Sequence, residues 1–229
     1  MKRYARVTRK LPREIVLLRG RPCIWGRCTF CDYIEDNTTD EDVMVRVADE
    51  VLGQVTGELG CLEVLNSGSI QELPPAVWER LRNKIRQAGI RELICESYWA
   101  YRERLDEVGR YFGIPTRIKI GVETFDAHLR NDVLNKAMFF DEPADVAGLT
   151  DSICLLVGFR GQTREIVRRD IEILLSHFQY ACINLFTPNT RSAALLDNEI
   201  KDWFREEYAW LDDHPTVEVL WQNTDFGVG

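Results

Sequence analysis

Three cysteines, Cys23, Cys28 and Cys31, lie within nine residues near the start of the chain. They follow a strand-like apolar run at residues 14–18, and the next cysteine along the chain is Cys61. A structural zinc ion takes four protein ligands, and a fully ligated iron-sulfur cluster takes four cysteines. Three thiolates from one loop therefore predict a 4Fe-4S cluster in which one iron is open to a ligand that is not protein.

An open iron of this kind suits radical chemistry with S-adenosylmethionine (SAM), because the amino acid part of SAM must chelate the iron before an electron splits the sulfonium bond. Two alternatives stay open from the residues alone. One is a zinc ion with Asp32 or a distant histidine as its fourth ligand, and the other is a set of unrelated thiols. The three histidines of the chain each lie in or beside a helical pattern, so none is an obvious fourth ligand: His128, His177 and His214.

The composition is that of a folded protein, with 45% hydrophobic and 29% charged residues in 229. We expect one domain spanning residues 1–229, with an N-terminal arm at about 1–12 and a C-terminal closing segment at about 214–229. No apolar run reaches membrane-spanning length and no signal-type stretch follows the first residues, which predicts a cytoplasmic protein without a membrane partner. The four other cysteines are scattered in apolar runs and are expected to be free buried thiols.

The formal net charge is −8. This charge argues against a large phosphate-neutralising surface, so stable nucleic-acid binding is not expected. Lysines and arginines gather only in the first ten residues, which predicts a solvated basic arm.

Strand and helix patterns alternate along the rest of the chain. We expect an α/β fold, a partial (β/α)6 TIM-like barrel of parallel strands joined by right-handed crossovers. The predicted strands are 14–18, 62–66, 92–97, 117–123, 152–158 and 180–186, with a final run at 217–221. The predicted helices are 40–55, 75–88, 101–112, 126–134, 163–177 and 198–211, with a loop and one short helical turn at 136–151.

In such a barrel the chemistry gathers at the carboxyl ends of the strands, where the cysteine loop also lies. Alternation along the strands turns Lys119 and Glu123 inward on one strand, and Asn184 and Phe186 inward on another. Glu96 ends a third strand. Arg117, near the start of its strand, is expected to join a salt bridge at the base of the barrel.

The chain resembles the radical SAM superfamily. Phe30, directly before the last cysteine, matches the aromatic residue whose backbone lies against the adenine of SAM in that family. Residues 65–69 match the small, glycine-containing segment that receives the ammonium group of SAM. Residues 120–125 and 158–163 are similar to strand ends in the branch of oxygen-independent coproporphyrinogen dehydrogenase and the Elongator catalytic subunit. The resemblance implies these cofactor contacts: Phe30, Asn66, Ser67, Gly68, Ser69, Glu96, Lys119, Glu123 and Arg160.

One spacing departs from the common family motif, which has three residues between the first two cysteines. Cys23 and Cys28 enclose four, so the loop must differ locally around Trp25. Trp25 could shield the cluster, contact substrate or pack within the loop.

Within the superfamily, residues 22–33 and the short chain are most similar to the queuine lyases, a family of bacterial queuosine-salvage enzymes. The resemblance implies a lyase that uses a 5′-deoxyadenosyl radical to release queuine from queuosine or queuosine 5′-phosphate, with a transient electron donor such as flavodoxin or ferredoxin. Asp225 is the candidate carboxylate for the edge of the 7-deazaguanine base, and Asn189 and Arg191 could contact a phosphate or a polar base edge. The full set expected to bind substrate is Trp25, Asn184, Phe186, Asn189, Arg191 and Asp225. A radical SAM enzyme modifying a 7-deazaguanine within tRNA, and a non-catalytic iron-sulfur or zinc module, are the alternative functions.

Overall fold

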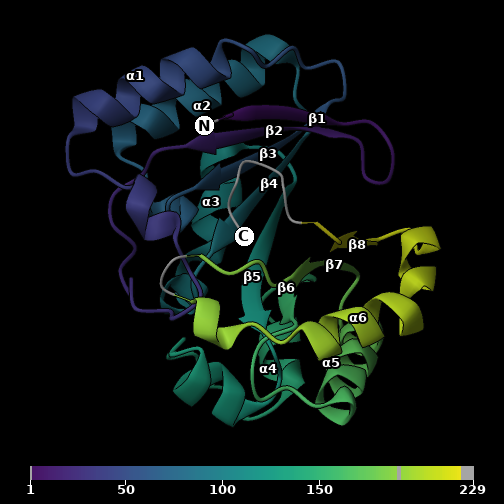
Figure 1. Cartoon of the computed structure of the whole chain (residues 1–229). Helices are drawn as coiled ribbons and strands as arrows, with labels where there is room; N and C mark the ends of the chain where they lie inside the picture. The colour runs from purple at the N-terminus through teal and green to yellow at the C-terminus, as the bar shows by residue number, and fades with distance from the viewer. Residues whose placement is uncertain (1, 190–191, 223–229) are drawn as a thin grey trace. The chain divides into compact units, whose positions relative to one another are not determined.

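The computed structural model describes residues 2–189 and 192–222 (Figure 1). The chain forms two compact units, which we call the first and second unit. The first contains the residues up to 26 together with 33–118, and the second contains 27–32 together with the residues from 119 onward. The cysteine loop therefore begins in the first unit, enters the second and returns.

The first unit is a layer of strands covered by helices, with α1 and α2 lying side by side (Figure 1). Strand β2 is buried along its whole length and pairs in parallel with β3, which pairs in parallel with β4. Asp40 begins α1 by accepting hydrogen bonds from the backbone N–H groups of Asp42 and Val43. The elements are β1 (Tyr4–Val7), β2 (Arg13–Leu18), η1 (Tyr33–Asp36), α1 (Glu41–Leu52), β3 (Cys61–Asn66), η2 (Ile70–Glu72), α2 (Pro75–Ala88), β4 (Glu92–Ser97), η3 (Trp99–Arg104) and α3 (Leu105–Phe112).

The N-terminal residues correct one expectation. Residues 4–7 are not a solvated arm but the antiparallel strand β1, paired with β2, so the strands are not all parallel. The basic residues there have partners far along the chain, since Arg3 binds Asp36 and Arg6 binds Glu58. Sequence spacing gave no sign of these distant acidic partners.

The second unit repeats the strand and helix alternation. Strands β6, β7 and β8 pair in parallel in register, and β5 pairs with β6 with an irregularity between Gly121 and Glu123. The first three residues of β5 belong to the first unit, where Arg117 forms the predicted salt bridge with Glu92. The elements are β5 (Thr116–Glu123), η4 (Leu129–Val133), α4 (Pro143–Ala147), β6 (Ser152–Val157), α5 (Arg164–His177), β7 (Tyr180–Leu185), η5 (Ala193–Leu195), α6 (Asn198–Glu207), η6 (Ala209–Asp213) and β8 (Val217–Leu220).

The predicted helix at 126–134 is instead largely a π-helix, η4, in which the backbone N–H of Leu134 donates to the carbonyl of Leu129. Both leucines belong to one buried apolar cluster with Phe159 and Phe186. Residues five apart lie on different faces of an α-helix, so the wider turn lets both leucines reach the same core.

No helix in the described part of the chain is both long and apolar enough to cross a membrane.

A buried polar network fixes the chain directly after β5. Asp170 of α5 is 3% exposed and accepts a hydrogen bond of 2.8 Å from the backbone N–H of Phe125. Arg130, 1% exposed, donates to the carbonyl of Thr124 at 3.0 Å. Burial raises the pKa of Asp170 to about 7, although the hydrogen bonds from Thr124 and Phe125 oppose the shift.

We predict that Asp170→Asn removes a pH dependence from stability. Because the folded-state pKa of Asp170 is raised, the native state holds a proton that the unfolded state releases, so the free energy of unfolding falls as pH rises from about 4 to about 7. The slope from this group is at most about 1.4 kcal/mol per pH unit. Urea unfolding across this range should show the wild type losing stability relative to the variant. Parallel stability curves would contradict the prediction.

Candidate functional site

The cysteine loop follows β2, whose carboxyl end is the expected location for chemistry in a parallel sheet. Cys23 belongs to the first unit, and Cys28 and Cys31 belong to the second. All three are half-buried and outside any disulfide, whereas the other four cysteines are buried, as predicted. The loop thus presents its three thiols at partly exposed positions.

In the first unit, Glu72 of η2 holds the start of the loop. Its carboxylate accepts hydrogen bonds of 2.6 Å from the backbone N–H groups of Ile24 and Ser69, and one of 3.4 Å from the Tyr101 hydroxyl. Burial raises the pKa of Glu72, against the effect of these hydrogen bonds. Gly68 makes the close approach possible, because a Cβ there would overlap the Glu72 carboxylate and lie 3.3 Å from the Cα of Cys23.

The predicted cofactor segment, residues 66–69, is buried apart from the partly buried Gly68. The Ser67 hydroxyl accepts a hydrogen bond of 2.9 Å from the backbone N–H of Gly20 and donates to its carbonyl, and the Ser69 hydroxyl accepts from Tyr98 N–H. The Asn66 amide donates to the carbonyl of Ser69 at 2.9 Å. Its oxygen Oδ1 is buried and accepts no hydrogen bond from any described residue. A buried acceptor of this kind suits a ligand that donates, such as an ammonium group.

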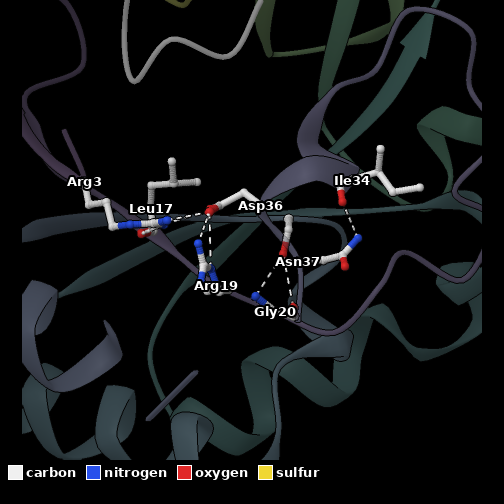
Figure 2. Close-up of polar contacts among 8 residues, drawn as sticks. Arg3, Leu17, Arg19, Gly20, Ile34, Asp36 and Asn37 are labelled. Atoms are coloured by element: carbon white, nitrogen blue, oxygen red, sulfur yellow. Dashed lines mark hydrogen bonds and ion pairs between the residues drawn. The ribbon is translucent and has the colours of Figure 1, made fainter. Parts of the chain in front are cut away.

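After the last cysteine the chain is tied back within the first unit (Figure 2). Arg3 binds Asp36 through two hydrogen bonds, of 2.5 and 2.8 Å, and Arg19 binds the same carboxylate at 2.9 Å. Burial opposes ionisation of Asp36, but the hydrogen bonds from both arginines hold its pKa below the usual value. The end of the loop is therefore fixed to β2, because Arg19 directly follows that strand.

In the second unit, the end of η4 and the residues directly after it hold the middle of the loop. Thr29 donates from its backbone N–H to the carbonyl of Leu134 at 3.0 Å and from its hydroxyl to the carbonyl of Val133 at 2.9 Å. The Asn135 amide donates to the carbonyl of Arg27 at 2.9 Å. Sequence analysis assigned this segment no role at the site, because none of these three hydrogen bonds leaves a signal in spacing or periodicity.

Asn189, predicted to contact substrate, also holds the same loop. Its amide donates to the carbonyl of Phe30 at 3.0 Å. Its oxygen accepts hydrogen bonds from Ser192, at 3.0 Å from the backbone and 2.9 Å from the hydroxyl. These contacts let Asn189 position the loop, and its predicted substrate contact stays a prediction.

Glu123, predicted to contact the cofactor, pairs with Lys136 at 2.5 Å. Both side chains are buried, and the Lys136 Nζ lies 5.4 Å from the centre of the Phe30 ring. Burial lowers the pKa of Lys136, but the charges of Glu123, Cys28 and Cys31 outweigh it and raise the pKa above its usual value. Sequence analysis missed Lys136.

The structure places the remaining predicted residues at different depths. Phe186 is completely buried in the apolar cluster, against which Phe30 of the loop packs, and Arg160 is exposed after β6. Arg191 and Asp225 lie outside the described residues, so their predicted substrate contacts stay predictions. Half-buried positions are found for the other predicted residues: Trp25 in the loop, Glu96 in β4, Lys119 in β5 and Asn184 in β7, where the Cys182 thiol donates to the Asn184 oxygen at 3.9 Å.

The residues fit the predicted 4Fe-4S cluster with SAM. The loop supplies three thiols, and Asn66 Oδ1 supplies a buried acceptor. Within residues 2–189 and 192–222, no three histidine, cysteine, aspartate or glutamate side chains come close enough to bind one metal ion. That finding concerns single-ion sites such as the zinc alternative. In a cluster, each thiolate binds a different iron, so the thiols need not meet at one point.

Comparison with known proteins identifies the family. No protein-family model and no curated protein sequence matches the chain. The solved structure of queuine lyase from Clostridium spiroforme bound to SAM and queuine is 44% identical, covers 100% of this chain and 99% of that chain, and superposes with a TM-score of 0.95. Two structures of Streptococcus suis SuiB, one of them bound to SAM, are 10% and 9% identical with TM-scores of 0.55 and 0.57. They cover 90% of this chain and about half of their own, and they show the fold alone. The predicted α/β fold of the radical SAM type is confirmed, and the chain belongs to the queuine lyase family of radical SAM enzymes.

Proposed function

We propose that this chain is a queuine lyase that binds SAM at a 4Fe-4S cluster held by Cys23, Cys28 and Cys31. Its substrate is queuosine or queuosine 5′-phosphate, and its product is the free base queuine. The observation that carries the proposal is the full-length match, at 44% identity, to a queuine lyase bound to SAM and queuine. Neither alternative function has a comparable match.

The cluster held by Cys23, Cys28 and Cys31 and the SAM bound to it would supply the radical chemistry that removes a hydrogen atom from the substrate ribose and so weakens the bond to the base. The chain's own residues bind and orient the reactants. Asn66 Oδ1 would accept a hydrogen bond from the ammonium group of SAM, and the backbone of Phe30 would lie against its adenine. The buried positions of Asn66 and Ser67 keep water away from that end of the cofactor.

The finer assignments are also proposals. Glu96, Lys119, Glu123 and Arg160 would complete the cofactor contacts. Trp25, Asn184, Asn189, Arg191 and Asp225 would contact the 7-deazaguanine nucleoside. A flavodoxin or ferredoxin would deliver the electron. Cysteines outside disulfides and an oxygen-labile cluster suit the reducing cytoplasm.

The decisive experiment is anaerobic reconstitution with iron and sulfide, followed by incubation with SAM, a reductant and queuosine or its 5′-phosphate. We expect about four irons per chain, 5′-deoxyadenosine and free queuine. Changing Cys23, Cys28 or Cys31 to Ala should abolish both products, while the matched variant Cys61→Ala should keep them. If the protein forms 5′-deoxyadenosine but releases queuine from neither substrate, the lyase proposal is wrong.

Asn66→Leu tests the cofactor ammonium contact. Loss of a hydrogen bond to a charged group typically costs about 1.5–3 kcal/mol, so the Kd for SAM should rise at least tenfold. Equilibrium dialysis of radiolabelled SAM against the reconstituted protein measures it. The control is Asn83→Leu, on the exposed face of α2. Equal SAM affinity in both variants would remove Asn66 from the cofactor site.

Gly68→Ala tests the close approach of η2 to the loop. The added Cβ overlaps the Glu72 carboxylate, so Glu72 must release Ile24 and the start of the loop must shift. We expect at least half of the cluster iron to be lost after reconstitution, at unchanged secondary structure by circular dichroism. Gly109→Ala, whose Cβ meets only ordinary contacts, is the matched control. Full iron content in Gly68→Ala would contradict this account.

A further inference from the structure

Lys136 is a buried cation that the proposed reaction does not use. Its side chain is 9% exposed, and its ammonium group lies 2.5 Å from Glu123 Oε1. The same ammonium group lies 5.4 Å from the centre of the Phe30 ring. In the sequence, Phe30 lies between Cys28 and Cys31. Burying a charged pair has a cost in solvation that its mutual attraction does not always recover. The position of the pair beside the thiols therefore calls for an explanation.

The backbone holds this pair in a strained arrangement. Asn135 and Ala137, on either side of Lys136, have φ of +50° and +48°, and Glu123 has φ of +66°. Leu11 is the remaining non-glycine residue with positive φ in the described part of the chain. Each such residue costs on the order of 1–3 kcal/mol and persists only where the surroundings enforce it. Backbone strain is thus concentrated in the two segments that carry Glu123 and Lys136.

The pair also needs the space that a side chain at position 121 would fill. A Cβ on Gly121 would lie 2.5 Å from Glu123 Oε1 and 3.0 Å from Lys136 Nζ, so a side chain there would displace both charged groups. The hydrogen bond from Asn135 to the carbonyl of Arg27 ties the lysine segment to the loop backbone. The lysine charge therefore has a fixed position relative to Cys28 and Cys31.

A fixed buried charge changes the free energy of any redox centre beside it. Reduction adds one electron, and hence one negative charge, to a cluster that already carries three thiolates. A nearby cation stabilises the reduced form and raises the midpoint potential, and a nearby anion does the opposite. Exposed charges have little effect because solvent and salt screen them.

We infer that Lys136 and Glu123 are positioning residues that set the reduction potential of the cluster on Cys23, Cys28 and Cys31, Lys136 raising it and Glu123 lowering it. The inference rests on the proposed function only in requiring that the chain hold the cluster. The electron comes from a one-electron donor, and no bond or proton transfer accompanies the step.

The test measures the midpoint potential of the reconstituted cluster without SAM, by redox titration followed by electron paramagnetic resonance, with iron content determined for every variant. Lys136→Met should lower the equilibrium constant for reduction by about tenfold or more, which is ~59 mV per tenfold for one electron. Glu123→Gln should raise it by a similar factor. Lys136→Arg keeps the charge and should stay within about threefold of wild type. The matched control is Lys2→Met, an exposed lysine, which should leave the potential unchanged.

The opposite signs separate an electrostatic role from a structural one, since a structural defect would not move the two variants in opposite directions. Unchanged potentials in fully loaded Lys136→Met and Glu123→Gln, or shifts in the same direction, would overturn the inference. If Lys136→Met loads too little iron, Glu123→Gln alone decides, and a potential that does not rise overturns it. A wild type that binds iron but releases no queuine rejects the lyase proposal, while these potentials still decide the role of the pair.

Discussion

The structure depends on one constraint: a loop whose thiols are reserved for a cluster must be held through its backbone. Glu72 accepts from the N–H of Ile24, Thr29 donates to the carbonyl of Leu134, and the amides of Asn135 and Asn189 donate to the carbonyls of Arg27 and Phe30. None of these bonds uses a cysteine side chain. The loop can therefore keep its conformation while its three sulfur atoms remain at half-buried positions for iron.

This constraint explains residues that otherwise look like ordinary structure. Glu72 is buried, and burial raises its pKa because it disfavours the charged carboxylate. The hydrogen bonds that Glu72 accepts from the loop explain why a carboxylate occupies this buried position. Asp36 uses two arginines to fix the chain just after the loop. Each unit thus fixes its own part of the loop with its own polar groups, the first unit at the start and end, and the second unit in the middle.

Much of this was predictable from sequence, and the failures have physical causes. The cysteine spacing, the alternation of strands and helices and the salt bridge of Arg117 are local or periodic signals, and the structure confirms the alternation and the salt bridge. Lys136 was missed because its partners, Glu123 and Phe30, are set by the tertiary fold. Strand β1 was missed because Arg3, just before it, and Arg6, within it, pair with acidic residues more than thirty residues away. Glu72 had a detectable signal, since it lies three residues after Ser69 in the spacing of a capping box.

The role of the buried pair also explains why the end of β5 does not carry residues that would cost less free energy in strain and desolvation. A glycine at position 123 would adopt its positive φ without strain, and apolar side chains would extend the neighbouring cluster of Leu134 and Phe186. Replacing buried ion pairs by apolar groups is often neutral or stabilising, so stability alone does not account for a strained glutamate facing a buried lysine. What an apolar replacement cannot supply is a pair of opposite charges at fixed positions beside Cys28 and Cys31. Because the two charges act on the cluster with opposite sign, small differences in their distances would tune its potential while the net charge of the pair stays zero.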